Sequence, residues 1–163
     1  MSPKSLPHEK ILTILAEAPS RIAALAAGLL PVQLRTAPGP EEWSANDVLA
    51  HLRSCADIWG SCIDVIINQD RPTLRAVNPR TWIKATDYLE QEFQASLHAF
   101  ASRRTELLAI LKALPPEGWS RTATVTGAGT VLERSVLSYA DWMARHERPH
   151  VKQIERIVTA LRQ

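Results

Sequence analysis

Hydrophobic residues recur every three to four positions along most of this chain, the spacing that buries one face of a helix. The pattern predicts four long helices, over residues 7–30, 44–66, 86–114 and 131–163. Pro19 and Pro149 fall inside the first and fourth of these, where proline removes a backbone hydrogen bond and kinks a helix. Residues 122–126 have a short extended pattern followed by a glycine-rich turn, and no sheet is predicted.

Capping and turn residues mark the boundaries between these helices. Ser44 is a favourable N-cap for the second helix, with Asp47 three residues later as its capping-box partner. Pro31 is predicted to close the first helix. Polar residues and prolines over residues 68–79 leave a connection of about 15 residues, which suits a crossover between parallel helices.

These elements predict an all-α fold, a four-helix bundle with a long crossover between helices 2 and 3, in which residues 1–163 form a single domain. The chain has 19 basic and 17 acidic residues and no basic run that could follow a phosphate backbone, so nucleic acid is not an expected partner. It has no apolar stretch of the ~20 residues that span a bilayer and no signal-peptide pattern. We therefore expect a cytoplasmic protein with no membrane partner.

Two histidines four residues apart are the strongest chemical signal. His146 and His150 leave the same face of the fourth helix and can chelate one metal ion. His51 lies in the apolar stripe of the second helix and offers a third nitrogen. Burying three imidazoles together without a metal would leave ring nitrogens short of partners. His8 and His98 have no partner at metal-binding spacing and are expected to be surface or otherwise satisfied residues.

Three neutral imidazoles would leave a divalent ion its full charge and an open coordination position, as in catalytic sites. Such an ion can activate water or hold a thiolate, and nitrogen ligands suit zinc, nickel, copper or iron. Asp47, Asp141 and Glu147 are the candidate general bases. For each a structural role is the stronger expectation: Asp47 as a cap, and the other two facing solvent or orienting a histidine.

Several other polar and aromatic residues have two interpretations. Cys55 and Cys62 are seven residues apart, about 10 Å along one helix, which is too far for a disulfide. We expect both to be reduced and buried, although Cys55, one turn after His51, is also a candidate reactive thiol. The aromatic residues on the predicted inner faces either belong to the core or line a pocket: Trp59, Tyr139 and Trp142. Arg103, Arg104 and Glu106 are expected on a solvated face.

The succession of motifs resembles the DinB-like superfamily over nearly the whole chain. The resemblance rests on Trp43-Ser44 through His51-Leu52, on Asp70-Arg71-Pro72, and on His146-x-x-x-His150 followed by Gln153-Ile154. It implies a four-helix bundle with a crossover between helices 2 and 3. It also implies a metal triad that falls on His51, His146 and His150 with none missing. Related members use nickel or zinc, and some transfer or isomerise with mycothiol, bacillithiol or glutathione.

The leading hypothesis is therefore a metal-dependent enzyme with a zinc or nickel ion on His51, His146 and His150. It would act on a small-molecule substrate as a hydrolase, or as a transferase that uses a low-molecular-weight thiol. The alternative is a non-catalytic, stress-linked metal-binding bundle in which the ion only stabilises the fold. A homodimer is left open, and no catalytic or cofactor-binding residue is assigned.

Overall fold

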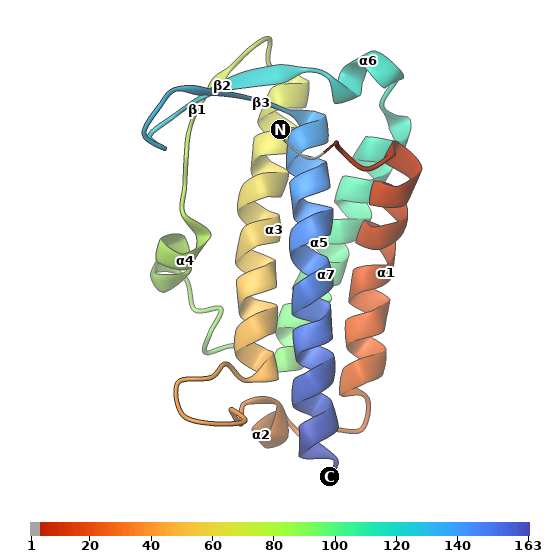
Figure 1. Cartoon of the computed structure of the whole chain (residues 1–163), viewed down its shortest axis with the longest axis vertical. Helices are drawn as coiled ribbons and strands as arrows, with labels where there is room; N and C mark the ends of the chain where they lie inside the picture. Colours follow the sequence, from red (N-terminus) through yellow and green to blue (C-terminus); the bar gives the residue numbers. More distant parts are fainter. Residues whose placement is uncertain (1–3) are drawn as a thin grey trace.

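Four long helices dominate the computed structural model, which describes residues 4–163. They are α1 (His8–Ala26), α3 (Ala45–Asn68), α5 (Phe93–Ala113) and α7 (Val136–Leu161). α1 and α7 run in one direction along the bundle, and α3 and α5 run in the other (Figure 1). The connection from α3 to α5 therefore joins parallel helices, and the predicted bundle with a long crossover is confirmed.

Shorter elements make up the connections. These are α2 (Pro31–Leu34), β1 (Thr73–Arg75), α4 (Pro79–Trp82), η1 (Ile83–Ala85), α6 (Pro116–Trp119), β2 (Thr122–Thr126) and β3 (Leu132–Ser135). The strands form a sheet in the order β1-β2-β3, with β1 parallel and β3 antiparallel to β2. This sheet lies across one end of the bundle (Figure 1). The extended pattern of residues 122–126 was predicted correctly, but the expectation of no sheet was wrong.

Three predicted helix boundaries were also wrong. The first helix ends at Ala26, two residues before Gly28 at φ +80°, and Pro31 begins α2 instead of closing α1. The third helix begins at Phe93 and not at residue 86, and Leu89, expected on its buried face, is 39% exposed. The fourth helix begins at Val136 because the residues before it pair with β2.

The two helical prolines lie in uninterrupted helices. α1 continues through Pro19 from His8 to Ala26, and α7 continues through Pro149 from Val136 to Leu161. Packing of the buried faces of these helices outweighs the loss of one backbone hydrogen bond in each. Pro149 therefore does not end α7 beside the histidines, and the kink expected there stays a prediction.

The core is divided into two hydrophobic clusters, one towards each end of the bundle. The cluster nearer the sheet includes Leu15, Ile63 and Met143, and the other includes Phe100 and Ile154. Three polar side chains, His51, Arg104 and Glu147, lie at the level where the two clusters meet. On each helix the polar residue is close in sequence to a residue of either cluster: Cys55 and Leu52 on α3, Leu107 and Phe100 on α5, and Ala144 and Val151 on α7. The candidate site belongs to this polar layer. No helix within residues 4–163 is long and apolar enough to cross a membrane.

Candidate metal centre

His51 is placed by the capping box at the start of α3. The Ser44 hydroxyl oxygen accepts a hydrogen bond from the Asp47 backbone N–H at 3.1 Å, and the Asp47 carboxylate accepts one from the Ser44 N–H at 3.0 Å. Two of the backbone N–H groups left unpaired at the start of the helix are thereby satisfied. Asp47 is a cap, as expected from the sequence, and His51 follows one turn later with 6% of its surface exposed.

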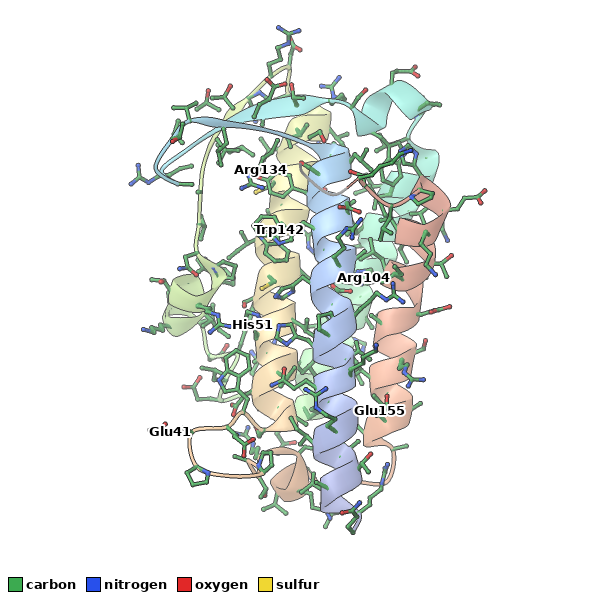
Figure 2. The ribbon with its side chains drawn as sticks, viewed as in Figure 1. Glu41, His51, Arg104, Arg134, Trp142 and Glu155 are labelled. Carbon is green, nitrogen blue, oxygen red and sulfur yellow. The ribbon has the colours of Figure 1, made fainter. Side chains whose placement is uncertain are left out.

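The three predicted histidines come together from two helices. The ring centroids of His146 and His150, one turn apart on α7, are 4.6 Å apart. The His51 ring on α3 lies 5.1 Å from that of His146 and 4.9 Å from that of His150. In Figure 2, His51 lies on the α4 side of the bundle, where α3 faces α7. The assignment of the three histidines as metal ligands stays a prediction.

The closest nitrogen pair has a separation that a shared metal ion would impose. The Nε2 atoms of His51 and His146 are 3.1 Å apart. Two nitrogens that each lie 2.0–2.1 Å from one zinc ion are about 3.3 Å apart at a tetrahedral angle. The Nδ1 atom of His146 is buried and has no hydrogen-bond partner within residues 4–163, so the ring is not held in place by a polar neighbour on that side. The two imidazoles therefore fit a shared divalent ion.

His150 is oriented by a neighbour on its own helix. Its Nδ1 lies 2.8 Å from Oε1 of Gln153, so an Nδ1–H donating to that oxygen leaves the Nε2 lone pair free. An outer hydrogen bond of this kind is what fixes the tautomer and ring direction of metal-binding histidines. Gln153 is therefore a further residue of the site, one that orients a ligand candidate. In the sequence it appeared only as part of the motif that follows His150.

Cys55 is a potential metal ligand that the sequence did not indicate. Its Sγ lies 3.7 Å from Nε2 and 3.9 Å from Nδ1 of His51. One potential donor atom from each of His51, Cys55 and His146 lies within 4.8 Å of the others. Burial, with a smaller contribution from the Glu147 charge, raises the pKa of the Cys55 thiol to about 12. In the metal-free protein this thiol is uncharged at neutral pH, which argues against the reactive thiol considered above.

Burial keeps two of the histidines neutral. It lowers the pKa of His51 from the usual 6.5 to about 4, with smaller contributions from His146, His150 and Arg80. It lowers the pKa of His146 to about 4 as well, assisted by His150 and Arg80. Neutral rings carry the lone pairs that a metal ion needs.

The same shifts predict how the metal-free protein responds to acid. Between about pH 6.5 and 4 the unfolded chain takes up protons on His51 and His146, whereas the folded chain does not. The free energy of unfolding should therefore fall as the pH falls through this window. Urea denaturation in the presence of a chelator measures it. In a variant with His51→Gln and His146→Gln, the free energy of unfolding should depend less steeply on pH. Equal slopes in the two proteins would contradict the lowered pKa values of these histidines.

The acidic candidates for a general base are occupied elsewhere. Glu147 is buried and forms two hydrogen bonds with the Arg104 guanidinium, so the expectation that it faces solvent or orients a histidine was wrong. Arg104, expected on a solvated face, is 3% exposed and also donates to the Leu15 carbonyl at 2.8 Å. The Asp141 carboxylate accepts from the Leu6 backbone N–H at 2.8 Å and pairs with Arg145 at 3.0 Å.

His8 and His98 lie away from the histidine cluster, whereas the aromatic candidates Trp59, Tyr139 and Trp142 differ in how close they come to it. His8 stacks on Trp119 with ring centroids 4.1 Å apart, and His98 is exposed on α5. Trp59 lies in the core with its ring 5.0 Å from that of His146, and Trp142 stacks on it at 4.5 Å. Tyr139 is a core residue. Of the three aromatic candidates, Trp59 touches the histidine cluster directly.

A groove of about 480 Å³ borders the site at His150. It is lined by Pro38, Glu41, Glu42, Trp43, Arg80, His150, Gln153, Arg156 and Ile157. The Trp43 ring lies 5.2 Å from that of His51, and the Arg80 guanidinium lies 5.2 Å from the centroid of Trp43. A small molecule in this groove would therefore reach His150 beside a tryptophan and a cation.

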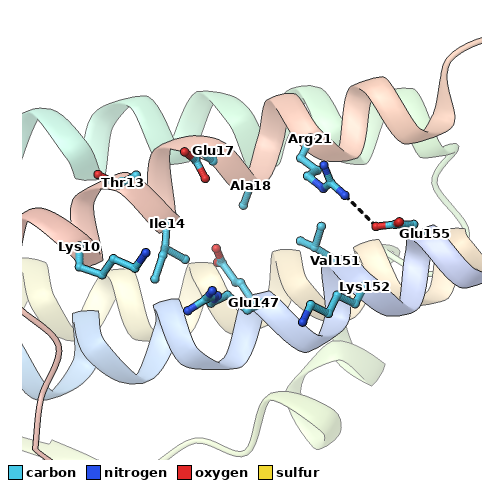
Figure 3. Close-up of a pocket in the computed structure, with 11 residues that line it drawn as sticks. Lys10, Thr13, Ile14, Glu17, Ala18, Arg21, Glu147, Val151, Lys152 and Glu155 are labelled. Atoms are coloured by element: carbon cyan, nitrogen blue, oxygen red, sulfur yellow. Dashed lines mark hydrogen bonds and ion pairs between the residues drawn. The ribbon is translucent and has the colours of Figure 1, made fainter.

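A second groove, of about 370 Å³, lies between α1 and α7 (Figure 3). Lys10, Glu17, Arg148 and Lys152 are among its lining residues, and the exposed Arg21–Glu155 ion pair, 2.7 Å long, closes one side. None of the three candidate histidines lines it. It is therefore not an entrance to the candidate centre.

Comparison with known proteins agrees with this architecture. A model described as the DinB superfamily matches residues 14–154. The solved structure of YfiT from Bacillus subtilis is similar with a TM-score of 0.75 and 17% sequence identity, covering 96% of this chain and 92% of that chain. That protein is described as a probable metal-dependent hydrolase with an unusual four-helix bundle topology. At this identity the likeness establishes the shared fold. A search of curated proteins found no match to this chain.

Proposed function

The chain belongs to the DinB superfamily, and on that premise we propose that it is a metal-dependent hydrolase of small molecules. A divalent ion, zinc or nickel, would be held by His51, His146 and His150. The observation that carries the proposal is the convergence of these three rings from α3 and α7, with centroids 4.6 to 5.1 Å apart. The description of the similar YfiT structure as a probable metal-dependent hydrolase supports the same class of reaction.

Such an ion would supply a Lewis acid that activates water near neutral pH. The protein's own contribution is to fix the geometry around it. Gln153 orients the ring of His150, and burial keeps His51 and His146 unprotonated. Trp43 and Arg80 line the groove that leads to His150, where they would contact the substrate.

Hydrolysis of a panel of small esters, amides and lactones tests this proposal. Protein purified without a nickel column should turn over at least one class after loading with zinc or nickel, and a chelator should abolish the activity. A His146→Ala, His150→Ala double variant should be inactive under every loading condition. If no substrate is turned over, or if the double variant is equally active, the hydrolase proposal fails.

One observation favours a second candidate function, a non-catalytic metal clip. Cys55 Sγ lies within 3.7 Å of His51, and four protein ligands complete the closed tetrahedron of a structural zinc site. A clip should lose thermal stability on chelation while the substrate panel gives no turnover. Transfer of a low-molecular-weight thiol to a small electrophile and assembly into a homodimer stay predictions. Adding thiols and a generic electrophile to the panel tests the first.

A further inference from the structure

We propose that Cys55 is a direct ligand of the metal ion, so that the centre contains sulfur as well as imidazole nitrogen. This inference rests on the proposed function, because it requires that an ion binds at the histidines. In this centre Cys55 takes the place of His150 as the third close donor beside His51 and His146, so one coordination position stays open for water, as hydrolysis requires. The sulfur comes from α3, the helix that also carries His51.

The position of the sulfur fits a shared ion. His51 and Cys55 are four residues apart on α3, so they leave the same face of the helix one turn apart. An ion about 2.3 Å from a thiolate sulfur and 2.0–2.1 Å from a nitrogen separates these atoms by roughly 3.5 Å at a tetrahedral angle. Cys55 Sγ lies 3.7 Å from His51 Nε2, the nitrogen that also approaches His146.

Packing alone does not account for this placement. Cys55 is 2% exposed and contributes to the cluster nearer the sheet, as a small apolar residue would. Its sulfur, however, lies against the His51 ring, and at 3.7 to 3.9 Å it makes only long contacts with the two ring nitrogens. An ion between the Nε2 atoms would hold both the rings and the sulfur.

A sulfur ligand would give the centre a preference for softer metals. On binding, the S–H bond of Cys55 breaks, a sulfur–metal bond forms, and the proton leaves to solvent. The thiolate cancels one charge of the ion and favours zinc over magnesium or manganese, which prefer oxygen ligands. The chain provides a matched control in Cys62, which lies two turns later on α3, is partly buried and is not part of the donor group.

Cobalt(II) substitution tests the sulfur ligand without measuring activity. The wild-type protein should develop visible d–d bands together with a near-ultraviolet sulfur-to-cobalt charge-transfer band on addition of one equivalent. Cys62→Ala should keep the charge-transfer band, and Cys55→Ala and Cys55→Ser should lose it while keeping d–d bands. The zinc-loaded wild type provides a check that needs no variant, because X-ray absorption should detect one sulfur neighbour at about 2.3 Å.

The outcomes separate this inference from the proposed function. Absence of any d–d band in the wild type would mean that no ion binds, and both proposals would fall. Bands without sulfur charge transfer, or an X-ray absorption spectrum with nitrogen and oxygen neighbours alone, would overturn the Cys55 ligand and leave the histidine centre in place. If the Cys55 variants do not fold, the X-ray absorption spectrum of the zinc-loaded wild type decides whether sulfur is a ligand.

Discussion

Replacing Glu147 with alanine should lower the free energy of unfolding by about 3–5 kcal/mol, the cost of breaking a buried ion pair from one side. Both side chains of the Arg104–Glu147 pair are 2% exposed, and the two carboxylate oxygens each accept a hydrogen bond from the guanidinium. Without Glu147, the Arg104 charge remains in the core with the Leu15 carbonyl as its main acceptor. Urea denaturation of the metal-free protein measures the loss.

The exposed ion pair on the same helix is the matched control. Glu155 of α7 pairs with Arg21 at 2.7 Å, with side chains 45% and 58% exposed, and Glu155→Ala should cost about 0–1 kcal/mol. A second comparison is the double variant with Arg104→Met and Glu147→Leu. Removal of both charges should restore much of the stability that Glu147→Ala loses, because no charge is then left unpaired. A loss below about 1 kcal/mol in Glu147→Ala would contradict the buried-pair account.

The sequence predicted the bundle because its helices are long and strongly periodic. It missed the sheet because β1 and β3 have only three and four residues, too few for alternation to be read. In β3, Leu132 stands four residues before Val136, so its pattern continues the helical stripe of α7. The strand forms because β2, from a separate part of the chain, supplies its hydrogen-bond partners, and that pairing is not a local property.

The candidate centre was only partly predictable. His146 and His150 are recognisable from their spacing on one helix. The apolar stripe of the second helix offered His51 as a third nitrogen, and the resemblance to the family grouped all three. The Arg104–Glu147 pair joins residues 43 positions apart, and nothing near Arg104 distinguishes it from the neighbouring Arg103, which pairs with Asp64 on the bundle surface. Long-range partners of this kind require the packed structure. Cys55 was identified as close to His51, but its distance to His146 depends on how α3 packs against α7.

A graded loss of metal affinity is the other large effect that we expect. His51→Ala removes a predicted ligand and should weaken zinc binding by more than 100-fold. Gln153→Ala removes only the outer hydrogen bond to His150, 2.8 Å long, and should cost about 10–100-fold. His98→Ala, at an exposed position on α5, should leave the affinity unchanged. Competition of each purified variant with a chromophoric chelator, together with elemental analysis, measures the three effects.

The order of these effects on zinc affinity distinguishes the loss of a ligand from a general loss of stability, which would not reproduce it. Glu147→Ala, next to His146 on α7 but directed to Arg104, should destabilise the fold strongly and weaken zinc binding far less than His51→Ala. His51→Ala should do the reverse, since an alanine at this position removes a donor without leaving a charge in the core. If the zinc affinities of these two variants followed their stabilities, His51 would be acting as a core residue, and its assignment as a zinc ligand would be wrong.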